Sequence, residues 1–245
     1  MNRESTHGRF AGRTALVTGA SGGIGRAVVS RLAAEGATVW ATDLNAPAEI
    51  QGSVHSRSLD VTDEQAWETL VKEIEDSGQL DALYLCHGIS QPVIPTVELT
   101  REQWERVQTV NLTSCFLGIR AAVPPMVRRG YGRIVALASI AAKEASALEH
   151  TYAASKAGLV ALVKSVGKEL ATTGVTVNSI APGPVQTELW NRLGDDLKQD
   201  RLRRTPMGRP ATPDEVASIA LWLGSDEASY STAQCFDASG GRATF

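Results

Sequence analysis

A glycine-rich turn between a strand pattern and a helical pattern is the feature that most constrains this chain. Residues Thr14–Thr18 form a short apolar run, Gly19-Ala20-Ser21-Gly22-Gly23-Ile24-Gly25 follows, and apolar residues then recur at helical spacing to Ala34. Such a turn brings backbone N–H groups and a helix N-terminus to one point, which suits a diphosphate. The order of strand, glycine turn and helix is typical of a nucleotide-binding α/β sheet.

The same alternation of strand and helix patterns continues along the chain. Helix starts are marked by Thr62 with Gln65, by Thr100 with Gln103, and by Thr212-Pro213-Asp214-Glu215. The further strands are expected at 37–42, 54–59, 80–86, 133–138, 175–180 and 234–237. Because alternation requires crossover connections, we predict an α/β fold: one doubly wound domain with about seven parallel strands and helices on both faces.

The domain is expected over residues 12–245, after an N-terminal arm at 1–11, with a variable substrate loop at about 187–209. The helix that starts at Thr100 is expected to continue toward Pro124-Pro125. We interpret the basic cluster Arg201-Leu202-Arg203-Arg204 as a solvated helix face.

Composition excludes several classes of protein. An apolar fraction of 43% and a charged fraction of 21% in 245 residues are ordinary globular values, so a full core is expected. The net charge of −3 argues against nucleic-acid and anionic-membrane partners. The three cysteines show no C-x-x-C spacing, so we expect neither disulfides nor a metal. With no signal peptide or apolar run of about 18 residues, the protein is expected to be soluble and cytoplasmic.

Three residues point to proton-transfer chemistry. Tyr152 and Lys156 are four positions apart, so on a helix they project from one face, where the ammonium favours the phenolate. Ser139 ends a buried strand pattern, which places its hydroxyl at the carboxyl end of a strand. Ligands of open α/β sheets bind at that edge. By itself a Tyr/Lys pair at this spacing is more often part of a helix surface.

An acid ends the second strand pattern and indicates the cofactor. Asp43 follows the first loop glycine by 24 residues, where a carboxylate can accept hydrogen bonds from both ribose hydroxyls of an adenosine and repel a 2′-phosphate. Neither Gly22 nor Leu44 supplies a cation for that phosphate. The sequence therefore favours NAD over NADP.

Taken together, the motifs resemble those of the short-chain dehydrogenase/reductase family over residues 10–241, and the resemblance implies a Rossmann fold. The matching residues are Thr18-Gly19-x-x-x-Gly23-x-Gly25, Asp60-Val61, Asn111, Ser139, Tyr152-x-x-x-Lys156 and Pro182-Gly183. The resemblance implies that Tyr152 is the acid/base and that Ser139 hydrogen-bonds the reacting oxygen. It also implies that Lys156 supports Tyr152 and holds the nicotinamide ribose, while Asn111 positions a water for proton relay.

The cofactor residues implied by the resemblance fall into groups. The diphosphate is expected near Gly19, Ser21, Gly23, Ile24 and Gly25, and the adenosine ribose near Asp43 and Leu44. The adenine is expected near Asp60 and Val61, and the central turn contributes Gly88. The nicotinamide is expected near Pro182, Gly183, Val185 and Thr187. The chain departs from the family at Leu85-Cys86-His87-Gly88, where Asn-Asn-Ala-Gly is common. This departure leaves the hydrogen bonding of that turn in doubt, and we interpret His87 as structural.

The substrate is expected in loops at about 90–96, 140–150 and 187–206, whose polar residues suit a small, oxygen-rich molecule. Candidate substrate contacts besides Ser139 and Tyr152 are Gln91 and His150. The C-terminal tail resembles that of sugar-acid dehydrogenases, and Arg242 could reach a neighbouring subunit's site in a homotetramer or homodimer. The expected activity is NAD-dependent interconversion of a secondary alcohol and a ketone on a small polar substrate such as a sugar acid or a polyol. The alternatives are a 3-oxoacyl-thioester reductase and a non-catalytic NAD-binding regulator.

Overall fold

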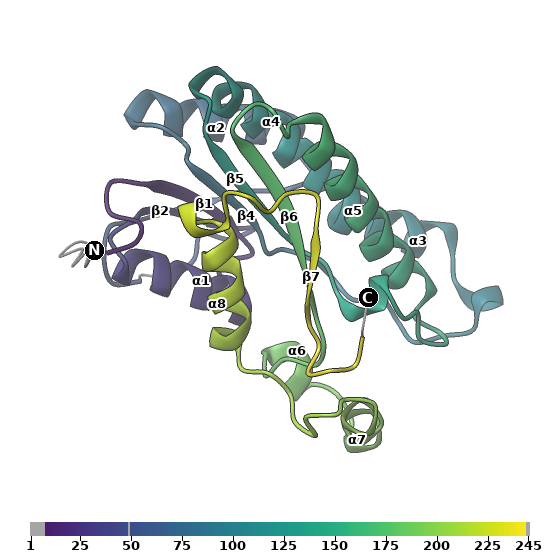
Figure 1. Ribbon diagram of the computed structural model, residues 1–245. Coiled ribbons are helices and arrows are strands. Elements are labelled where there is room, and N and C mark those ends of the chain that lie inside the picture. The colour runs from purple at the N-terminus through teal and green to yellow at the C-terminus, as the bar shows by residue number, and fades with distance from the viewer. Residues whose placement is uncertain (1–7, 49, 244–245) are drawn as a thin grey trace.

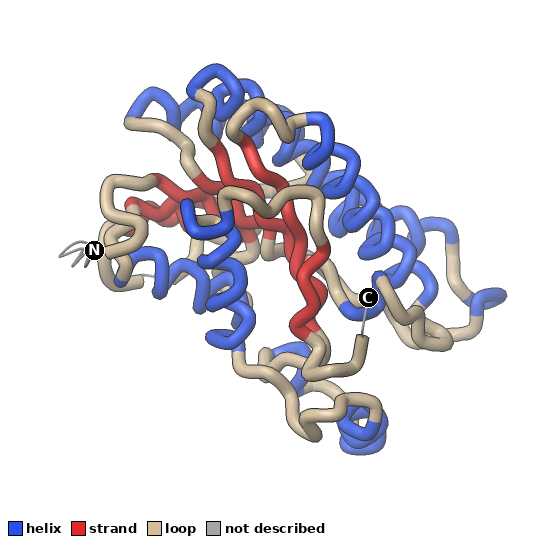
Figure 2. The backbone as a smooth tube through the Cα atoms, viewed as in Figure 1, coloured by secondary structure: helices blue, strands red, loops and turns tan. Residues whose placement is uncertain are grey.

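The computed structural model describes residues 8–48 and 50–243, and in this part of the chain the strands form one seven-stranded parallel sheet between two layers of helices (Figure 1, Figure 2). The strands are β1 (Thr14–Thr18), β2 (Thr38–Asp43), β3 (Val54–Ser58), β4 (Ala82–Leu85), β5 (Gly132–Leu137), β6 (Val175–Pro182) and β7 (Cys235–Ala238). The helices are α1 (Gly23–Ala34), α2 (Glu64–Ser77), α3 (Arg101–Gln108), α4 (Ser114–Arg129), α5 (His150–Glu169), α6 (Glu188–Asn191), α7 (Asp195–Arg203) and α8 (Pro213–Leu223).

The strand order is β3-β2-β1-β4-β5-β6-β7, with every neighbouring pair parallel. The predicted doubly wound sheet is therefore confirmed. The order reverses between β1 and β4, and a crevice opens at the carboxyl ends of the strands where such a reversal occurs. We call these strand ends the carboxyl edge. The glycine turn follows β1 at this edge, and Ser139 follows β5.

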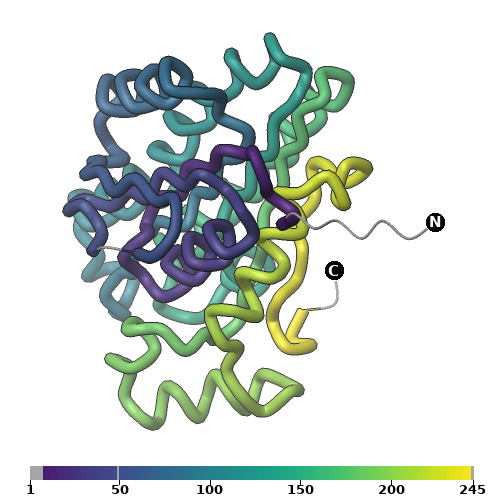
Figure 3. Tube along the Cα trace, turned by 90° about the vertical axis from the view of Figure 1, so that its left-hand side faces the viewer, coloured from purple at the N-terminus to yellow at the C-terminus, as the bar shows by residue number. Residues whose placement is uncertain are grey.

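Each face of the sheet has its own apolar core. On one face, Val28 of α1 and Leu221 of α8 pack with sheet residues such as Val17, and all three are fully buried. On the other face, Trp67 of α2, Ile119 of α4 and Leu159 of α5 form a second cluster. Helices thus cover both faces (Figure 3). Near-continuous burial of the central strands is what a doubly covered parallel sheet requires.

The helix connecting β4 to β5 differs from its prediction in two ways. A π-helical turn at Thr109–Thr113 separates α3 from α4, and α4 continues past Pro124 and Pro125 to Arg129, where Gly130 caps it with a φ of +69°. Each proline removes only one i→i−4 hydrogen bond, and burial of Pro125 helps to hold the helix together. The whole run 101–129 is long and apolar enough to cross a membrane by composition, but its buried side packs on the sheet as a core helix.

Local signals placed most helix starts correctly. Capping boxes form at Thr100 with Gln103 and at Thr212 with Glu215, as predicted. The predicted cap at Thr62 is wrong, because Asp63 caps α2 by accepting from the Ala66 N–H.

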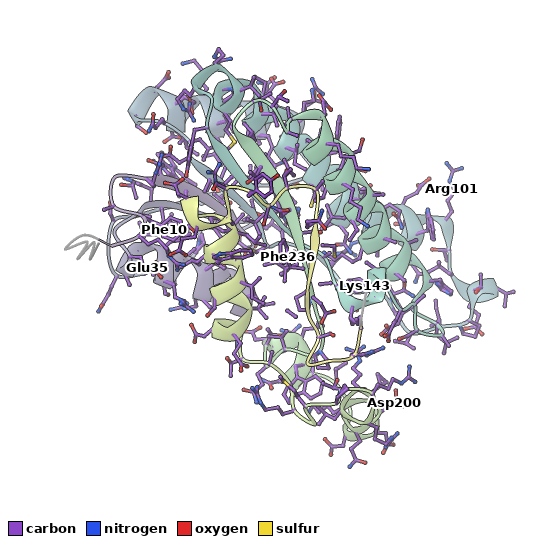
Figure 4. All side chains as sticks on the ribbon, in the orientation of Figure 1. Phe10, Glu35, Arg101, Lys143, Asp200 and Phe236 are labelled. Atoms are coloured by element: carbon purple, nitrogen blue, oxygen red, sulfur yellow. The ribbon has the colours of Figure 1, made fainter. Side chains whose placement is uncertain are left out.

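The described part of the N-terminal arm packs against the end of α1. Phe10 is 2% exposed, and its N–H donates to the Glu35 carbonyl at 3.0 Å (Figure 4). The apolar Phe10 side chain therefore extends the core on the α1–α8 face, and residues 8–11 are not the loose arm that the sequence suggested. Residues 1–7 of the predicted arm lie outside the described residues.

The substrate loop forms two short helices beyond the carboxyl edge. In Figure 1, α6 and α7 lie at the bottom, past the ends of β6 and β7. Figure 4 labels Asp200 on α7 and Lys143 in the segment after β5, and these two segments lie on opposite sides of this region. The loop thus forms a cover over the edge where ligands of such sheets bind.

Candidate active site

A cavity of about 560 Å³ lies at the carboxyl edge of the sheet. Its walls come from the segments that follow β4, β5 and β6, from the start of α5, and from α6, α7 and the C-terminal tail. Ser139, Tyr152 and Lys156 all line it. The three residues on which the sequence prediction rests therefore share one space.

Hydrogen bonds and burial fix the orientation of these side chains. The Lys156 Nζ lies 5.9 Å from the centroid of the Tyr152 ring and donates to the Leu137 carbonyl at 2.8 Å. Lys156 is 3% exposed, so its ammonium is held beside the phenol at the end of β5. The Ser139 Oγ accepts from the Ala141 N–H at 3.1 Å, which uses a lone pair and leaves its O–H able to donate to a ligand.

Asn111 lies in the π-helical turn and is completely buried. Its amide accepts from the Ile89 N–H at 2.8 Å and donates to the Ile89 carbonyl at 2.9 Å and the Ser155 Oγ at 3.1 Å. A Cβ at Gly88 would lie 3.2 Å from the Lys156 Nζ and 3.3 Å from the Asn111 Oδ1. Glycine at 88 therefore allows the turn after β4 to approach both side chains.

The glycine turn has the geometry of an anion site. Gly19 has a φ of +65°, and a Cβ there would lie 2.8 Å from the backbone of His87. A Cβ at Gly25 would collide with the Gly19 carbonyl oxygen. Helix α1 starts at Gly23 with no side-chain cap and no acid in its first turn, so its first N–H groups and its dipole favour an anion.

Asp43 stands beside this turn at the end of β2. Its carboxylate accepts from the Ser21 N–H at 3.0 Å and from the Leu44 N–H at 2.8 Å. At the end of the next strand, Asp60 accepts from the hydroxyl and the N–H of Thr62, and these bonds hold the pKa of Asp60 below its usual value. The acids predicted for the adenosine end thus lie at the ends of adjacent strands.

The predicted nicotinamide residues meet the glycine turn. Pro182, Gly183, Val185 and Thr187 line the cavity after β6, together with Ile24. The Thr187 Oγ caps α6 by accepting from the Trp190 N–H at 3.4 Å, and a Cβ at Gly23 would lie 2.9 Å from the Thr187 methyl group. Leu44, Asp60 and Val61 do not line this cavity, as befits residues predicted for the adenosine end. Open glycine backbone, an uncapped helix and a strand-end acid together fit a dinucleotide.

His87 forms a bridge between the glycine turn and α4. Its Nδ1 lies 2.6 Å from the Thr18 Oγ, and its Nε2 lies 2.7 Å from the Ser114 Oγ. Burial, with the charge of Lys156, lowers the pKa of His87 to about 3, so the imidazole is neutral. These contacts supply the hydrogen bonding that the sequence left in doubt at this turn.

The two candidate substrate residues at the cavity rim are differently placed. Gln91 lines the cavity but is 7% exposed, and its amide bonds to the Tyr152 N–H and to backbone carbonyls. His150 is absent from the cavity wall, and its Nδ1 accepts from the Thr151 N–H at 3.2 Å. The structure therefore does not place the His150 side chain among the groups that line the cavity.

Two ion pairs at the rim were not predicted. Arg201 of α7 bonds to Glu149 at 2.6 Å, and Arg242 of the tail bonds to Glu144 at 2.9 Å. Arg201 and Arg204 line the cavity, so reading this cluster as only a solvated face was wrong. Arg242 lines the cavity of its own chain.

Part of the remaining cavity lining was missed from the sequence. Its charged residues Asp196, Asp200, Arg201 and Arg204 come from α7 and its C-terminal end, whereas Glu144 and Glu149 lie in the loop at 140–150 where the substrate was expected. The apolar residues Leu189, Leu193 and Leu197 come from α6, α7 and the turn between them. Their pattern in the sequence is that of any short surface helix, so no local signal marks them as cavity residues.

Comparisons with known proteins agree with this geometry. The profile of the family described as Enoyl-(Acyl carrier protein) reductase matches residues 19–243. A 2-dehydro-3-deoxy-L-rhamnonate dehydrogenase (NAD(+)) from Sphingomonas sp. (strain SKA58) is 39% identical, over 97% of this chain and 98% of its own. A 3-oxoacyl-[acyl-carrier-protein] reductase from Thermotoga maritima is 36% identical, over 95% and 98%. The structure of a short-chain type dehydrogenase/reductase from Mycobacterium ulcerans has a TM-score of 0.90 at 30% identity, over 95% and 90%.

The fold and the site define a nicotinamide-dependent oxidoreductase that acts on CH–OH groups. The chain belongs to the short-chain dehydrogenase/reductase family, as its motifs predicted.

Proposed function

We propose that this protein is an NAD-dependent dehydrogenase that interconverts a secondary alcohol and a ketone on a small polar substrate, such as a sugar acid or a polyol. The observation that carries the proposal is that Ser139, Tyr152 and Lys156 share a cavity whose rim is rich in charged groups. Such a rim can form hydrogen bonds with several substrate oxygens. The name of the Sphingomonas relative, an NAD(+) dehydrogenase of a deoxy sugar acid, supports the same substrate class.

Each residue of the site has a distinct role in this proposal. The bound nicotinamide supplies the hydride chemistry. Tyr152 takes the hydroxyl proton during oxidation and returns it during reduction. Ser139 donates a hydrogen bond to the same oxygen, while Lys156, whose Nζ lies 5.9 Å from the centroid of the Tyr152 ring, holds ribose hydroxyls. Asn111 holds the water through which the proton passes to solvent.

The glycine turn and the strand ends would hold NAD. The diphosphate would lie against the α1 N-terminus, and Asp43 would accept hydrogen bonds from the adenosine ribose. A 2′-phosphate would meet the Asp43 carboxylate, and the neighbouring Leu44, which is 65% exposed, offers it no cation. NAD is therefore the cofactor that this end of the site fits, in agreement with the NAD(+) in the name of the Sphingomonas relative.

A second candidate is reduction of a 3-oxoacyl thioester. The apolar residues Leu189, Leu193 and Leu197 in the cavity favour it, as does the similarity to acyl-carrier-protein reductases. An acyl chain would leave the charged rim groups without substrate partners, which favours the polar substrate. NADH formation across sugar acids, polyols and hydroxyacyl thioesters separates the two, because only the favoured class should give turnover at millimolar concentration.

The decisive variant is Tyr152→Phe. Loss of the phenolic hydroxyl should lower kcat by about 10²- to 10⁴-fold, the usual contribution of a general acid/base, and leave the Kd for NADH within about twofold. Tyr230→Phe is the matched control, because Tyr230 is fully exposed and lies outside the cavity lining. Turnover by Tyr152→Phe at the wild-type rate would remove the proposed acid/base.

We further propose that the enzyme works in the cytoplasm as a homotetramer or homodimer. The support for this proposal is the family membership of the chain.

A further inference from the structure

The helix that carries Tyr152 begins without a cap of its own. Glu149 occupies the N-cap position of α5, but its side chain accepts no hydrogen bond from the helix. The carboxylate is instead paired with Arg201 at 2.6 Å. The first N–H groups of a helix have no backbone partner inside it. In α5 the Thr151 N–H is taken by the His150 Nδ1 at 3.2 Å, whereas the Tyr152 N–H finds its acceptor outside the helix.

Gln91 supplies that acceptor from the loop after β4. Its Oε1 accepts from the Tyr152 N–H at 2.7 Å. Tyr152 is the third residue of α5, and the N–H at this position is one that an N-cap side chain normally takes. The cap therefore comes from 61 residues earlier in the chain.

The other end of the same amide holds the segment that enters the helix. The Gln91 Nε2 donates to the Leu148 carbonyl at 2.8 Å and to the Pro92 carbonyl at 3.1 Å. Leu148 has a φ of +67°, a left-handed conformation that is costly for a leucine and persists only where the surroundings hold it. The Gln91 Nε2 also lies 3.4 Å from the His150 Nδ1, a longer contact than those to the two carbonyls. The amide nitrogen and one oxygen lone pair of Gln91 are thus engaged by groups of the protein itself.

We propose that Gln91 is a positioning residue for catalysis: its side chain is a long-range cap that fixes the first turn of α5 and, with it, the Tyr152 hydroxyl. This inference rests on the proposed role of Tyr152 as acid/base. It also assigns Gln91 to the enzyme's own backbone rather than to the substrate, because donation to a substrate would require release of Leu148 or Pro92.

The position of the cap explains why its loss should act on kcat. Tyr152 lies in the first turn, where an uncapped helix frays, whereas Lys156 lies a turn further along and is held by the Leu137 carbonyl. Movement of the phenol by about 1 Å relative to Ser139 is enough to lower turnover by about 10²-fold. NADH binding should change little, because Lys156 and the glycine turn keep their contacts.

The test uses two variants and a matched control on the purified enzyme. Gln91→Met keeps the length of the side chain but removes every polar atom, and Gln91→Glu keeps the acceptor. Gln65→Met, on the exposed surface of α2, is the control. For each we would measure kcat and KM in the ketone-reducing direction, the Kd for NADH by fluorescence, and the dependence of kcat on pH.

Gln91→Met is expected to lower kcat by about 10- to 100-fold, with the Kd for NADH within about twofold, while Gln65→Met leaves both unchanged. Gln91→Glu should recover kcat relative to wild type as the pH falls. A protonated carboxyl group can donate to Leu148 and accept from Tyr152 in the same way as the amide, whereas the ionised form cannot donate.

Three outcomes would overturn the inference. A rise in KM with unchanged kcat for Gln91→Met would make Gln91 a substrate ligand. A lower melting temperature with unchanged kcat per folded molecule would make it a structural residue only. If Tyr152→Phe is inactive while Gln91→Met is fully active, this inference fails alone; if Tyr152→Phe retains turnover, the proposed function fails with it.

Discussion

The imidazole of His87 has a defined tautomer because its partners have defined roles. The Ser114 hydroxyl donates to the Val110 carbonyl at 2.6 Å, so its oxygen accepts the hydrogen of the His87 Nε2. The Nδ1 then accepts from the Thr18 hydroxyl. A directed chain of hydrogen bonds joins the glycine turn to the end of the π-helical turn, and it needs the neutral ring. His87 thus joins the end of β1 to the start of α4 through its two ring nitrogens.

A neutral buried histidine should make the fold sensitive to acid. The pKa of His87 is about 3 in the fold against an ordinary value of 6.5, so between these pH values only the unfolded chain takes up this proton. Above pH 6.5, His87 therefore has no effect on how the free energy of unfolding depends on pH. Below pH 6.5, it lowers the free energy of unfolding by about 1.4 kcal/mol for each unit by which the pH falls. The substitution His87→Gln removes this titrating group. The free energy of unfolding of the variant should therefore fall less steeply with decreasing pH than that of the wild type, by about 1.4 kcal/mol per pH unit.

Urea denaturation between pH 4 and pH 8 measures this difference in slope between wild type and variant. His55→Gln is the control, because His55 lies exposed on β3, where the folded and unfolded chains both leave it in contact with water. Equal slopes for wild type and His87→Gln would show that folding does not lower the pKa of His87.

At the scale of helices and strands, the sequence predicts those features that depend on residues close together in the chain. The capping box at Thr100 with Gln103 was predictable because its partners are three residues apart. The cap at Thr62 was not, because Asp60 takes the Thr62 hydroxyl and leaves Asp63 to cap α2. Each of these side chains can cap, and only the backbone path after β3 selects one of them.

The same limit applies to the site. Ser139, Tyr152 and Lys156 could be brought together in advance, because strand ends of a parallel sheet meet at one edge. The pairing of Glu149 with Arg201 could not, since it joins residues 52 positions apart through a loop whose path no local pattern encodes. The long-range cap of Gln91 has the same origin, because it joins residues 61 positions apart.

Helix α7 is held over the cavity by the ion pair between Arg201 and Glu149. The side chains are 30% and 19% exposed, so the pair is only partly screened by water. We expect a coupling energy of about 1 kcal/mol between the two side chains. It is measured from kcat/KM as the free-energy change of the double variant minus the sum of the free-energy changes of Arg201→Met and Glu149→Gln. A coupling energy of zero would mean that α7 keeps its place without this contact.

For the whole molecule, the sheet brings the end of the chain back to its catalytic centre. Strand β7 is the last in the sheet order, beside β6, and the tail after it returns along the carboxyl edge. The Ser239 hydroxyl accepts from the Arg242 N–H at 3.1 Å and from the Ala243 N–H at 3.0 Å, which fixes the turn. The tail therefore supplies part of the cavity wall that the loop after β5 begins.

Arg242 is the residue through which the tail should affect substrate binding. Its side chain is 7% exposed and holds Glu144, five residues after Ser139. Arg242→Met keeps the bulk of the stem but leaves the Glu144 carboxylate without this partner beside the substrate. We expect KM for a polar substrate to rise about tenfold, kcat to change less than threefold, and the Kd for NADH to stay constant, because the cofactor contacts lie on other strands. Arg192→Met is the control, since Arg192, directly after α6, is 79% exposed and lies outside the cavity lining. An unchanged KM for Arg242→Met would exclude the tail from the substrate site, whatever the chemistry of Tyr152.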